Sequence, residues 1–294
     1  MPSPRAGESR DDFLDRCIPE VVAEGRDPDQ AVAMCIAYYE GEKDKAFNVD
    51  KMGEVEYWKA FERKRESFES RYERKLLKAF REQTKFLEGA TTIQDLKGRI
   101  DPEPMRKAIE ELYSEVGDSF ARSVFSGLKR MADIEYKNFP QWRQNILNEI
   151  DYDRILAING FTQEIFEKTI LSALQEGLSL QETIRRLREG GFSQARAKRI
   201  ARTEIATASN AGSLIGALAT NLPFKKRWVH IKDGVVRGAN PDDTFNHTNV
   251  EDVDKNDSFN VSGEMMKYPA QSGPGISPGN VINCRCTLVY ITLD

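Results

Sequence analysis

Apolar residues recur at steps of three and four through most of the first 220 residues, which is the spacing of one face of an α-helix. The clearest run extends from Met52 to about Glu88, where an aromatic-rich stripe is interleaved with glutamate, lysine and arginine. Further helices are predicted over residues 105–137, 141–159, 165–174, 180–188 and 195–214, with Thr162 as the cap of the helix over 165–174. The pattern therefore predicts an irregular helical body over residues 46–220.

The first 45 residues have a pattern of their own. Two short amphipathic segments flank a turn signal at Gly25–Pro28, which predicts a helical hairpin module over residues 1–45. A hairpin of this size has little apolar surface to bury, so we expect it to dock on a partner or on the rest of the chain. Cys17 and Cys35 fall within its two helices, and we interpret them as small buried apolar residues.

From Asn221 onward the pattern changes to that of short strands. Residues 225–231 have the alternation and the β-branched and aromatic content of a strand, and Asp233–Gly234 predicts a hairpin turn into a return strand over 235–237. Two short extended segments follow at 259–263 and 265–269, and a last strand is predicted over 281–293. The fold class is therefore mainly α: an irregular helical body followed by a small β-rich (α+β) C-terminal domain over residues 221–294.

The overall charge changes this picture little. A net charge of −4 and a pI near 5.6 argue against a dedicated nucleic-acid-binding protein. One basic run could still contact DNA phosphates without regard to sequence. Interspersed glutamates and the lack of aromatic residues for base stacking favour a solvated face or a protein contact instead. The basic residues concerned are Arg185, Arg186, Arg196, Lys198 and Arg199.

Membrane and secretion signals are not found in the sequence. No segment approaches the roughly 20 apolar residues that a membrane span needs. The N-terminus also has no apolar signal-peptide core, so we expect the chain to stay in the cytoplasm where it is made. Four cysteines in 294 residues are too few for a disulfide framework, which agrees with a reducing compartment.

Candidate chemistry is confined to the last 70 residues, which hold His230, His247, Cys284 and Cys286. No phosphate-binding loop, dinucleotide fingerprint or nucleophile elbow occurs, so we expect no enzymatic activity and no catalytic residues. A thiolate paired with His247 as base stays a minor alternative. Two histidines and two cysteines could also ligate zinc, but structural zinc sites more often space their cysteines by two to four residues. We therefore favour a polar network without a cofactor or metal, with zinc as the alternative.

A series of spaced residues in the C-terminal half carries a resemblance to a known family. These residues are Arg202, Glu204, Asn210, Trp228, Asp233, Arg237, His247, Phe259, Pro269, Asn283, Cys284 and Cys286. Over residues 160–294 the chain resembles the tailed-phage head morphogenesis family, the Mu F-like minor head proteins, and the terminal Asn-Cys-Arg-Cys is the most specific element. In that family the histidine usually follows the arginine closely, whereas about ten residues rich in asparagine and aspartate separate Arg237 from His247 here.

The resemblance implies a structural role in the phage head. It implies a low-copy protein of the virion or procapsid interior that is assembled in the host cytoplasm and binds the portal or major capsid protein, and the scaffold as a further partner. Weak nonspecific contact with DNA and a part in genome packaging or delivery would be compatible with this role. Two other interpretations stay open: a zinc-stabilised DNA-binding accessory protein, and a phage-encoded effector or toxin. Bound metal and steep salt dependence would favour the zinc-stabilised protein, whereas the assembly role requires a protein partner.

Overall fold

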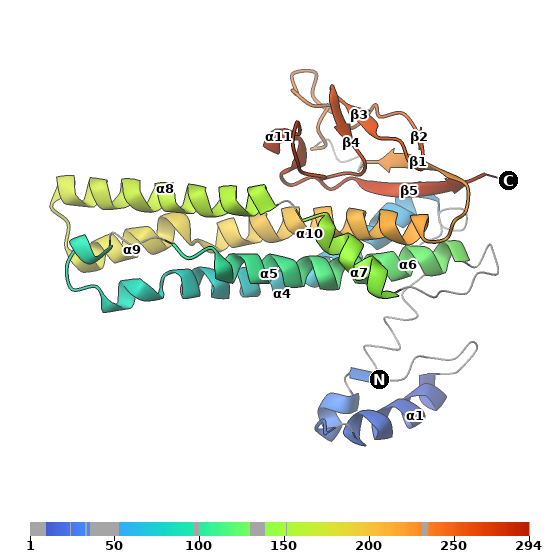
Figure 1. The fold of residues 1–294 in the computed structure, drawn as a ribbon, viewed down its shortest axis with the longest axis horizontal. Coiled ribbons are helices and arrows are strands. Elements are labelled where there is room, and N and C mark those ends of the chain that lie inside the picture. Colours follow the sequence, from blue (N-terminus) through green and yellow to red (C-terminus); the bar gives the residue numbers. More distant parts are fainter. Residues whose placement is uncertain are drawn as a thin grey trace. The chain divides into compact units, whose positions relative to one another are not determined.

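The computed structural model describes residues 10–23, 25–32, 34–35, 53–96, 100–129, 139–150, 152–230 and 235–293. The chain divides into two compact units, Met1–Phe47 and Asn48–Asp294. Helices dominate, and the strands assigned in the described ranges lie in the C-terminal part of the second unit (Figure 1), which confirms the predicted mainly α fold class. The finer domain boundaries at residues 45 and 220 stay predictions. No helix in the described ranges is both long and apolar enough to cross a membrane.

The first unit contains α1 (Arg10–Ala23), a turn at Gly25 and a second helical stretch that includes residues 28–32. Gly25 has φ +88°, a left-handed conformation that glycine adopts without the strain a side chain would add. The Asp27 carboxylate accepts hydrogen bonds from the backbone N–H groups two and three positions ahead of it, and so caps the second stretch. The predicted helix, turn and helix are confirmed over these residues.

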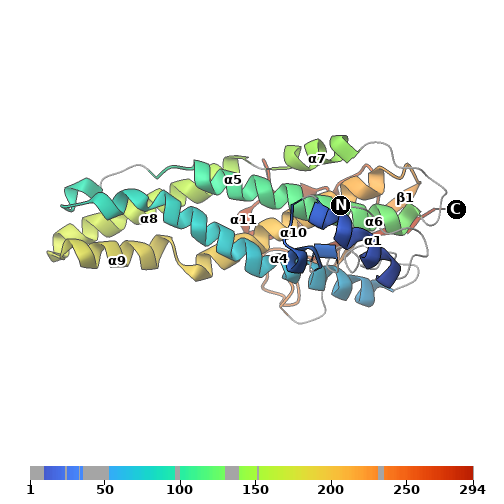
Figure 2. The ribbon, with the colours of Figure 1, turned by 90° about the horizontal axis from the view of Figure 1, so that it is seen from below.

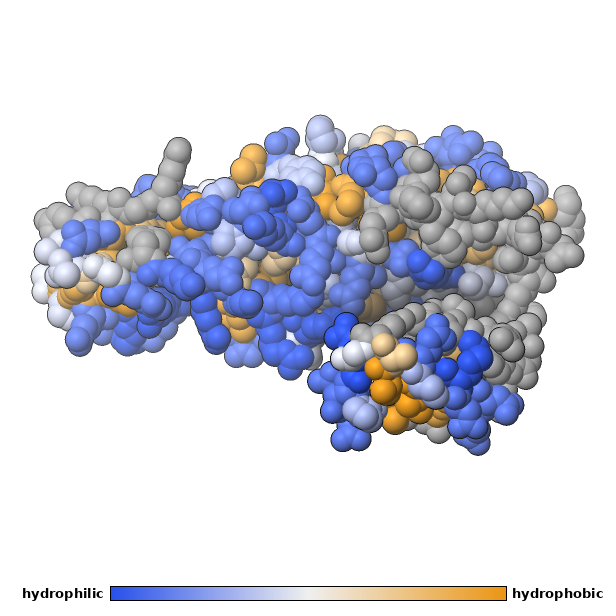
Figure 3. All heavy atoms as spheres, turned by 60° about the horizontal axis from the view of Figure 1, so that its bottom comes forward, coloured by the Kyte–Doolittle hydropathy of each residue, from blue (hydrophilic) through white to orange (hydrophobic). Residues whose placement is uncertain are grey.

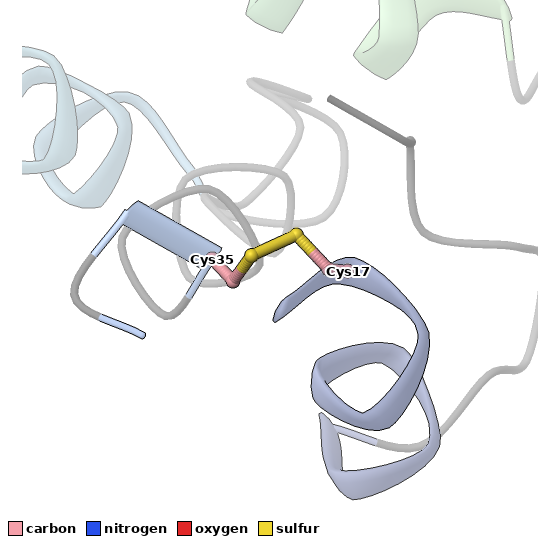
Figure 4. Close-up of a disulfide and its surroundings, with 2 residues drawn as sticks. All are labelled: Cys17 and Cys35. Atoms are coloured by element: carbon pink, nitrogen blue, oxygen red, sulfur yellow. A yellow bond between two sulfur atoms is a disulfide. The ribbon is translucent and has the colours of Figure 1, made fainter. Parts of the chain in front are cut away.

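A disulfide joins Cys17 to Cys35 across this hairpin (Figure 4), with 6.0 Å between the two Cα atoms. Both residues are fully buried, as expected, and pack with Phe13, Val21 and Ala31. The prediction that they are merely small apolar residues is nevertheless wrong, because their sulfur atoms are bonded. The physical reason is the small size of the unit, since a core this small commonly needs a covalent cross-link to hold its helices together.

The second unit is built around α10 (Gln194–Leu218), which is buried along most of its length. It packs against α4 (Glu54–Gln83) and α6 (Asp118–Lys129), although α4 lies far from it in the sequence (Figures 1 and 2). The predicted aromatic stripe of α4 is confirmed at Phe61, Tyr72 and Phe80, which are all buried. The other helical elements of this unit are η1 (Lys85–Gly89), η2 (Gln94–Leu96), α5 (Glu103–Leu112), the π-helical turn η3 (Tyr113–Gly117), α6 (Asp118–Lys129), α7 (Phe139–Asn148), α8 (Tyr152–Glu176), α9 (Leu180–Gly191) and α11 (Pro278–Val281).

Glycines let α10 touch the backbone of the π turn and of α6. A Cβ atom on Gly212 would lie 2.1 Å from the carbonyl oxygen of Gly117, and one on Gly216 would lie 2.2 Å from that of Ala121. Real Cβ atoms are not found so close to a carbonyl oxygen, so any larger residue would force the helices apart. The predicted role of small residues in close packing along this helix is confirmed.

Helix α8 runs without a break through residues 159–162, where the sequence predicted one helix to end and the next to begin. Thr162, the predicted cap, lies inside the helix and donates from Oγ1 to the carbonyl oxygen of Ile158 at 2.7 Å. Gly160 is exposed, so it leaves no gap in the core, and its cost of about 1 kcal/mol relative to alanine is outweighed by the packing of α8 on α9. The predicted break is therefore wrong, and α7 ends earlier, at Asn148.

The C-terminal part contains two small antiparallel sheets. In the first, β1 (Phe224–Val229) lies between β2 (Val253–Asp254) and β5 (Thr287–Thr292), with Trp228 opposite Leu288. The second is the hairpin of β3 (Phe259–Val261) and β4 (Glu264–Met266). Its turn residues, Ser262 and Gly263, both have positive φ, as the two-residue turns of such hairpins require. This hairpin confirms the two short extended segments predicted there.

Two strand predictions for this part are wrong. Residues 235–237 form no return strand, because the neighbours of β1 come from β2 and from the far end of the chain; the predicted turn at Asp233–Gly234 lies outside the described residues. The last strand begins at Thr287 rather than at Val281, because Pro278 starts a helical turn and Asn283 takes a positive φ of 58°. Pairing between strands distant in sequence is the feature that local alternation does not report.

Charged side chains cover the helical surface and pair along it. Hydrophilic residues dominate the described face of the helical body that is visible in Figure 3. Arg106 contacts Glu103 and Glu110 one turn away on either side, and Arg202 bonds to Glu69 of α4 at 2.9 Å. The salt-bridged exterior predicted for the long helix is thus present, and such exposed pairs add little stability individually.

Candidate functional site

Helix α10 presents a polar stripe to the C-terminal sheet and holds its backbone in place. Thr207 donates to the carbonyl oxygen of Ala270 at 2.8 Å, and the Ser213 hydroxyl lies 2.6 Å from that of Tyr290. Asn210 donates from Nδ2 to the carbonyl oxygens of Pro269 at 2.9 Å and Cys286 at 3.1 Å. These residues follow at steps of three along α10, so one helix face carries them all. All are buried, which makes each bond costly to lose.

Arg65 of α4 reaches the same segment from the other side. Its Nη2 donates to the carbonyl oxygen of Cys286 at 3.1 Å and its Nη1 to that of Arg285 at 3.3 Å. Its Nε donates to the Ser209 hydroxyl at 2.7 Å, and its guanidinium lies over the Phe61 ring at 4.6 Å. Only 3% of Arg65 is exposed, so a buried positive charge fixes the backbone around the Cys-Arg-Cys motif.

Cys284, Cys286 and His247 meet just ahead of β5. The Sγ atoms of Cys284 and Cys286 lie 3.7 and 3.5 Å from Nδ1 of His247, and the three potential ligand atoms all lie within 4.8 Å of one another. All three residues are buried, while Arg285 between the cysteines is exposed. The two cysteines are unbonded thiols. The structure therefore brings together the two cysteines and one of the two histidines that the sequence singled out, and His230 is not part of the group.

The loop between Arg237 and His247 closes on itself. The backbone N–H of His247 donates to the carbonyl oxygen of Arg237 at 2.9 Å, and the N–H of Gly238 donates to the Asp243 carboxylate at 2.7 Å. Arg237 in turn donates from Nη2 to the carbonyl oxygen of Ile282. The additional residues thus form an excursion whose ends are adjacent. The arginine and the histidine remain neighbours in space despite their wide separation in the sequence.

Asn280 orients the His247 ring. Its Oδ1 lies 2.5 Å from Nε2 of His247, and its Nδ2 donates to the Glu264 carboxylate at 2.8 Å. Burial opposes ionisation of Glu264, but hydrogen bonds from Ser277 and Asn280 outweigh it and lower the pKa of the carboxyl. A network of carboxylate, amide and imidazole therefore runs from β4 to the cysteines.

Aromatic rings enclose the group. The Trp228 ring meets His247 edge to face at 5.3 Å and Phe259 at 5.5 Å. Beside them, the buried Lys226 donates from Nζ to the carbonyl oxygens of Asp257 at 2.6 Å and Lys267 at 3.0 Å. Burial lowers the pKa of Lys226 to about 8. The site is thus dry on its sheet side, where electrostatic interactions are strong.

The two thiols have unequal surroundings. A hydrogen bond from Cys286 is the largest influence that lowers the pKa of the Cys284 thiol, and His247 acts in the same direction. Burial raises the pKa of Cys286, against an opposing contribution from the Trp228 N–H. That indole N–H is buried and lies within hydrogen-bonding range of no oxygen or nitrogen acceptor in the described part of the chain. The arrangement favours ionisation of Cys284 over that of Cys286, with the Cys286 thiol as the donor to it.

A surface pocket of about 490 Å³ opens onto these residues. Its floor includes His247, Cys284 and Cys286, and its wall carries both acidic and basic side chains from α4, α10 and the closed loop. The charged residues that line the pocket are Glu62, Arg65, Glu66, Glu69, Arg202, Arg237 and Arg285. Small molecules or ions could approach the thiols from this side, whereas the aromatic side is closed.

Three more of the residues that carry the resemblance lie beside this site or in the helical body. Arg202 lines the pocket and bonds to Glu69 of α4. Glu204 is buried in the helical body, where it accepts a hydrogen bond from Tyr113 at 3.1 Å and lies 2.9 Å from Arg154. Asn283 has a positive φ and donates from its backbone to Thr203 at 3.2 Å, which directs both cysteines inward. Asp233 lies outside the described residues.

The basic run of α9 and α10 does not form one free cationic face. Arg185 pairs with Glu182 and Glu189, and Arg186 pairs with Glu176. Arg196 is buried and donates to the carbonyl oxygen of Ile158, so it is not available to DNA. Lys198 and Arg199 are exposed. Contact with DNA through the exposed residues stays a prediction.

Sequence reasoning missed Arg65, Asn280 and Lys226. Arg65 occupies a position on the aromatic stripe of α4, and a charged residue on a buried stripe indicates an internal partner. Lys226 shares the inward face of β1 with Phe224 and Trp228, which carries the same signal. Asn280 lies in a loop rich in glycine, serine and proline that gives no such indication.

Comparison with known proteins identifies the C-terminal region. No curated protein and no solved structure matches the chain. Residues 164–289, which include α10 and every residue of the Cys-Arg-Cys site, match the family model described as Phage Mu protein F like protein. Over these residues, which make up less than half of its length, the chain is similar to the Mu F-like family of phage head proteins.

Proposed function

We propose that this protein is a minor structural protein of the phage head that acts in head morphogenesis by docking on the portal or on the major capsid protein at the inner capsid surface. The observation that carries the proposal is the family match over residues 164–289. The matched segment is not self-contained, because Arg65 of α4 completes the contacts to its Cys-Arg-Cys backbone. The helical body and the matched region would therefore enter the particle as one unit.

The surface chemistry is compatible with this role. Ion pairs neutralise much of the basic run on α9, so tight binding of packaged DNA is not expected from that helix. Lys198 and Arg199 would supply at most weak, salt-sensitive contact. The protein partner must then provide most of the affinity, through the exposed surface of the second unit, through the first unit, or through both.

Co-expression with the portal, major capsid and scaffolding proteins of the same genome tests the proposal. Assembled particles would be separated by sedimentation and their proteins counted by mass spectrometry. The expected result is incorporation at a constant, low ratio to the portal protein. Omitting the portal or the major capsid protein in turn then identifies the partner, because incorporation is lost with the protein that binds this chain.

Two variants make the result specific. Gly212→Leu places a side chain against the Gly117 carbonyl and disrupts the helical body, so it is expected to abolish incorporation. Arg63→Leu removes an exposed charge from α4 and is expected to leave incorporation unchanged. A wild-type chain that stays entirely in the soluble fraction while particles form would contradict the proposed role.

A further inference from the structure

We propose that His247, Cys284 and Cys286 bind a zinc ion through Nδ1 and two Sγ atoms, with the remaining position open to the surface pocket. Thiolate and imidazole are the ligands that zinc prefers in proteins. All three donors are buried, converge from two separate segments and lie within 4.8 Å of one another. The inference concerns metal content, so it can fail or succeed independently of the role in head assembly.

The distances fit tetrahedral coordination. Bonds of about 2.3 Å to sulfur and about 2.05 Å to nitrogen at a tetrahedral angle place the two atoms about 3.6 Å apart. The observed separations from Nδ1 of His247 are 3.7 Å to Cys284 and 3.5 Å to Cys286. One ion could therefore bind all three atoms with little movement of the side chains. The single residue between the cysteines is no obstacle, because both precede β5 and Arg285 turns outward.

The hydrogen-bond network selects the ring nitrogen that faces the cysteines. The Glu264 carboxylate can only accept, so the amide it contacts must be Nδ2 of Asn280. Oδ1 of Asn280 then faces Nε2 of His247 and accepts a hydrogen bond from its N–H. Nδ1 is left with a lone pair directed at the two sulfur atoms. A histidine held in this way by its other nitrogen is the usual arrangement of a metal ligand.

The surroundings suit a bound ion with two thiolate ligands. The Trp228 N–H is a buried donor without a hydrogen-bond partner among the described residues, and the backbone carbonyl of Cys286 is held by Arg65 and Asn210. The carbonyl contacts fix one ligand to both long helices of the body. On the open side, the pocket admits water, which would complete a site of three protein ligands. An ion in this position would tie the closed loop, the turn before β5 and the helical body together.

Metal analysis of the purified full-length chain tests the proposal. The protein would be produced without a metal-affinity tag in medium supplemented with zinc, dialysed against metal-free buffer and measured by inductively coupled plasma mass spectrometry. About one zinc ion per chain is expected, and Cys284→Ser together with Cys286→Ser should remove it. Cys17→Ser together with Cys35→Ser is the matched control, because it replaces the other two cysteines and should retain the ion. Wild-type protein with no more zinc than the Cys284/Cys286 variant would overturn the proposal.

Cobalt substitution provides a second readout that does not depend on comparing variants. Co(II) added to metal-free wild-type protein is expected to give the visible bands of tetrahedral coordination and a thiolate charge-transfer band. Asn280→Leu should keep the ligands but weaken zinc binding about 10- to 100-fold in a chelator competition, because the His247 ring loses its orienting partner. An octahedral cobalt spectrum, or unchanged affinity in Asn280→Leu, would show that this geometry is not the one that binds metal.

Discussion

The helical body and the C-terminal part of the second unit are held together by different kinds of contact. The body relies on close approach, with Gly212 and Gly216 against a carbonyl backbone and aromatic rings such as Phe61 and Phe120 at 4.5 Å. The C-terminal part relies on buried polar side chains that bind its backbone carbonyls, as Arg65 and Asn210 do at Cys286. The helical body should therefore be damaged most by a larger side chain at its glycine contacts. The C-terminal part should be damaged most by the removal of a hydrogen-bond donor.

This difference has a consequence for stability. The C-terminal part buries apolar residues such as Trp228, Phe259 and Tyr268, but it is joined to the helices by hydrogen bonds whose net contributions are modest individually. It is therefore expected to be the first region of the second unit to open, while the crossing of α10 and α6 persists to the global transition. The three tryptophans, at positions 58, 142 and 228, all lie in the second unit, so their fluorescence follows its unfolding.

The largest effect is expected from adding atoms to the steric contact. Gly212→Leu should lower the free energy of unfolding by about 3 kcal/mol or more, because its Cβ alone would meet the Gly117 carbonyl. Gly160→Leu is the control, since a Cβ there meets no atom within 4 Å and the position is exposed on α8. That control should be neutral or stabilising by up to about 1 kcal/mol in urea denaturation. Equal losses in the two variants would show that the close crossing has no special energetic role.

Removing a partner from the polar contact should cost slightly less. Arg65→Leu removes one donor from each of the carbonyls of Arg285 and Cys286 and also leaves the buried Ser209 hydroxyl without its guanidinium partner, so it should destabilise the unit by about 2 kcal/mol. Hydrogen exchange should locate the change, with protection lost first in β5. Arg63→Leu, two residues away on the exposed face of α4, should change the free energy of unfolding by less than about 0.5 kcal/mol. A uniform loss of protection over α10 would indicate instead that Arg65 supports the body.

The two donors to Cys286 should not act independently. Arg65 and Asn210 share one acceptor, and each single variant leaves it one donor, so the double variant Arg65→Leu, Asn210→Leu should lose more stability than the sum of the single losses. A coupling of about 1 kcal/mol in the double-mutant cycle is expected. The losses of stability in Asn210→Leu and Arg63→Leu should add in their double variant. Additive losses in both cycles would show that Arg65 and Asn210 act independently at Cys286.

The smallest effect is expected from Lys226. Its pKa is lowered to about 8 by burial, against an ordinary value of 10.5, so between these values the unfolded state holds a proton that the folded state has released. Stability of wild type relative to Lys226→Met should therefore rise with pH over this window, by the order of 1 kcal/mol. Lys225→Met, on the exposed face of the same strand, controls for loss of a lysine. A difference that falls as pH rises would contradict the sign of the shift.

How well the sequence predicted the structure depended on how local each feature is. The long helices and the β3–β4 hairpin follow from spacing and turn residues within a few positions, and these predictions were confirmed. The partners of β1 could not be predicted, because β5 is joined to it only through tertiary pairing. Likewise the break at Gly160 was wrong because the packing of α8 outweighs one weak helix former. The site needed both the sequence and the structure. Cys284 and His247 could be singled out as rare residue types in the sequence, whereas the role of Asn280 follows only from its position in the fold.

The π turn between α5 and α6 sets how relatives of this protein should be compared. It accommodates one more residue than an α-helix would, and each residue advances an α-helix by about 100°. Deleting a single residue between Tyr113 and Gly117 would thus remove the bulge and leave plain α-helix, in which α6 keeps the face that it presents to α10. We expect a one-residue gap here in homologous chains to coincide with the same residues facing α10, whereas a gap elsewhere in α5 or α6 would change them. The π turn is then the place in these helices where the loss of one residue does least harm.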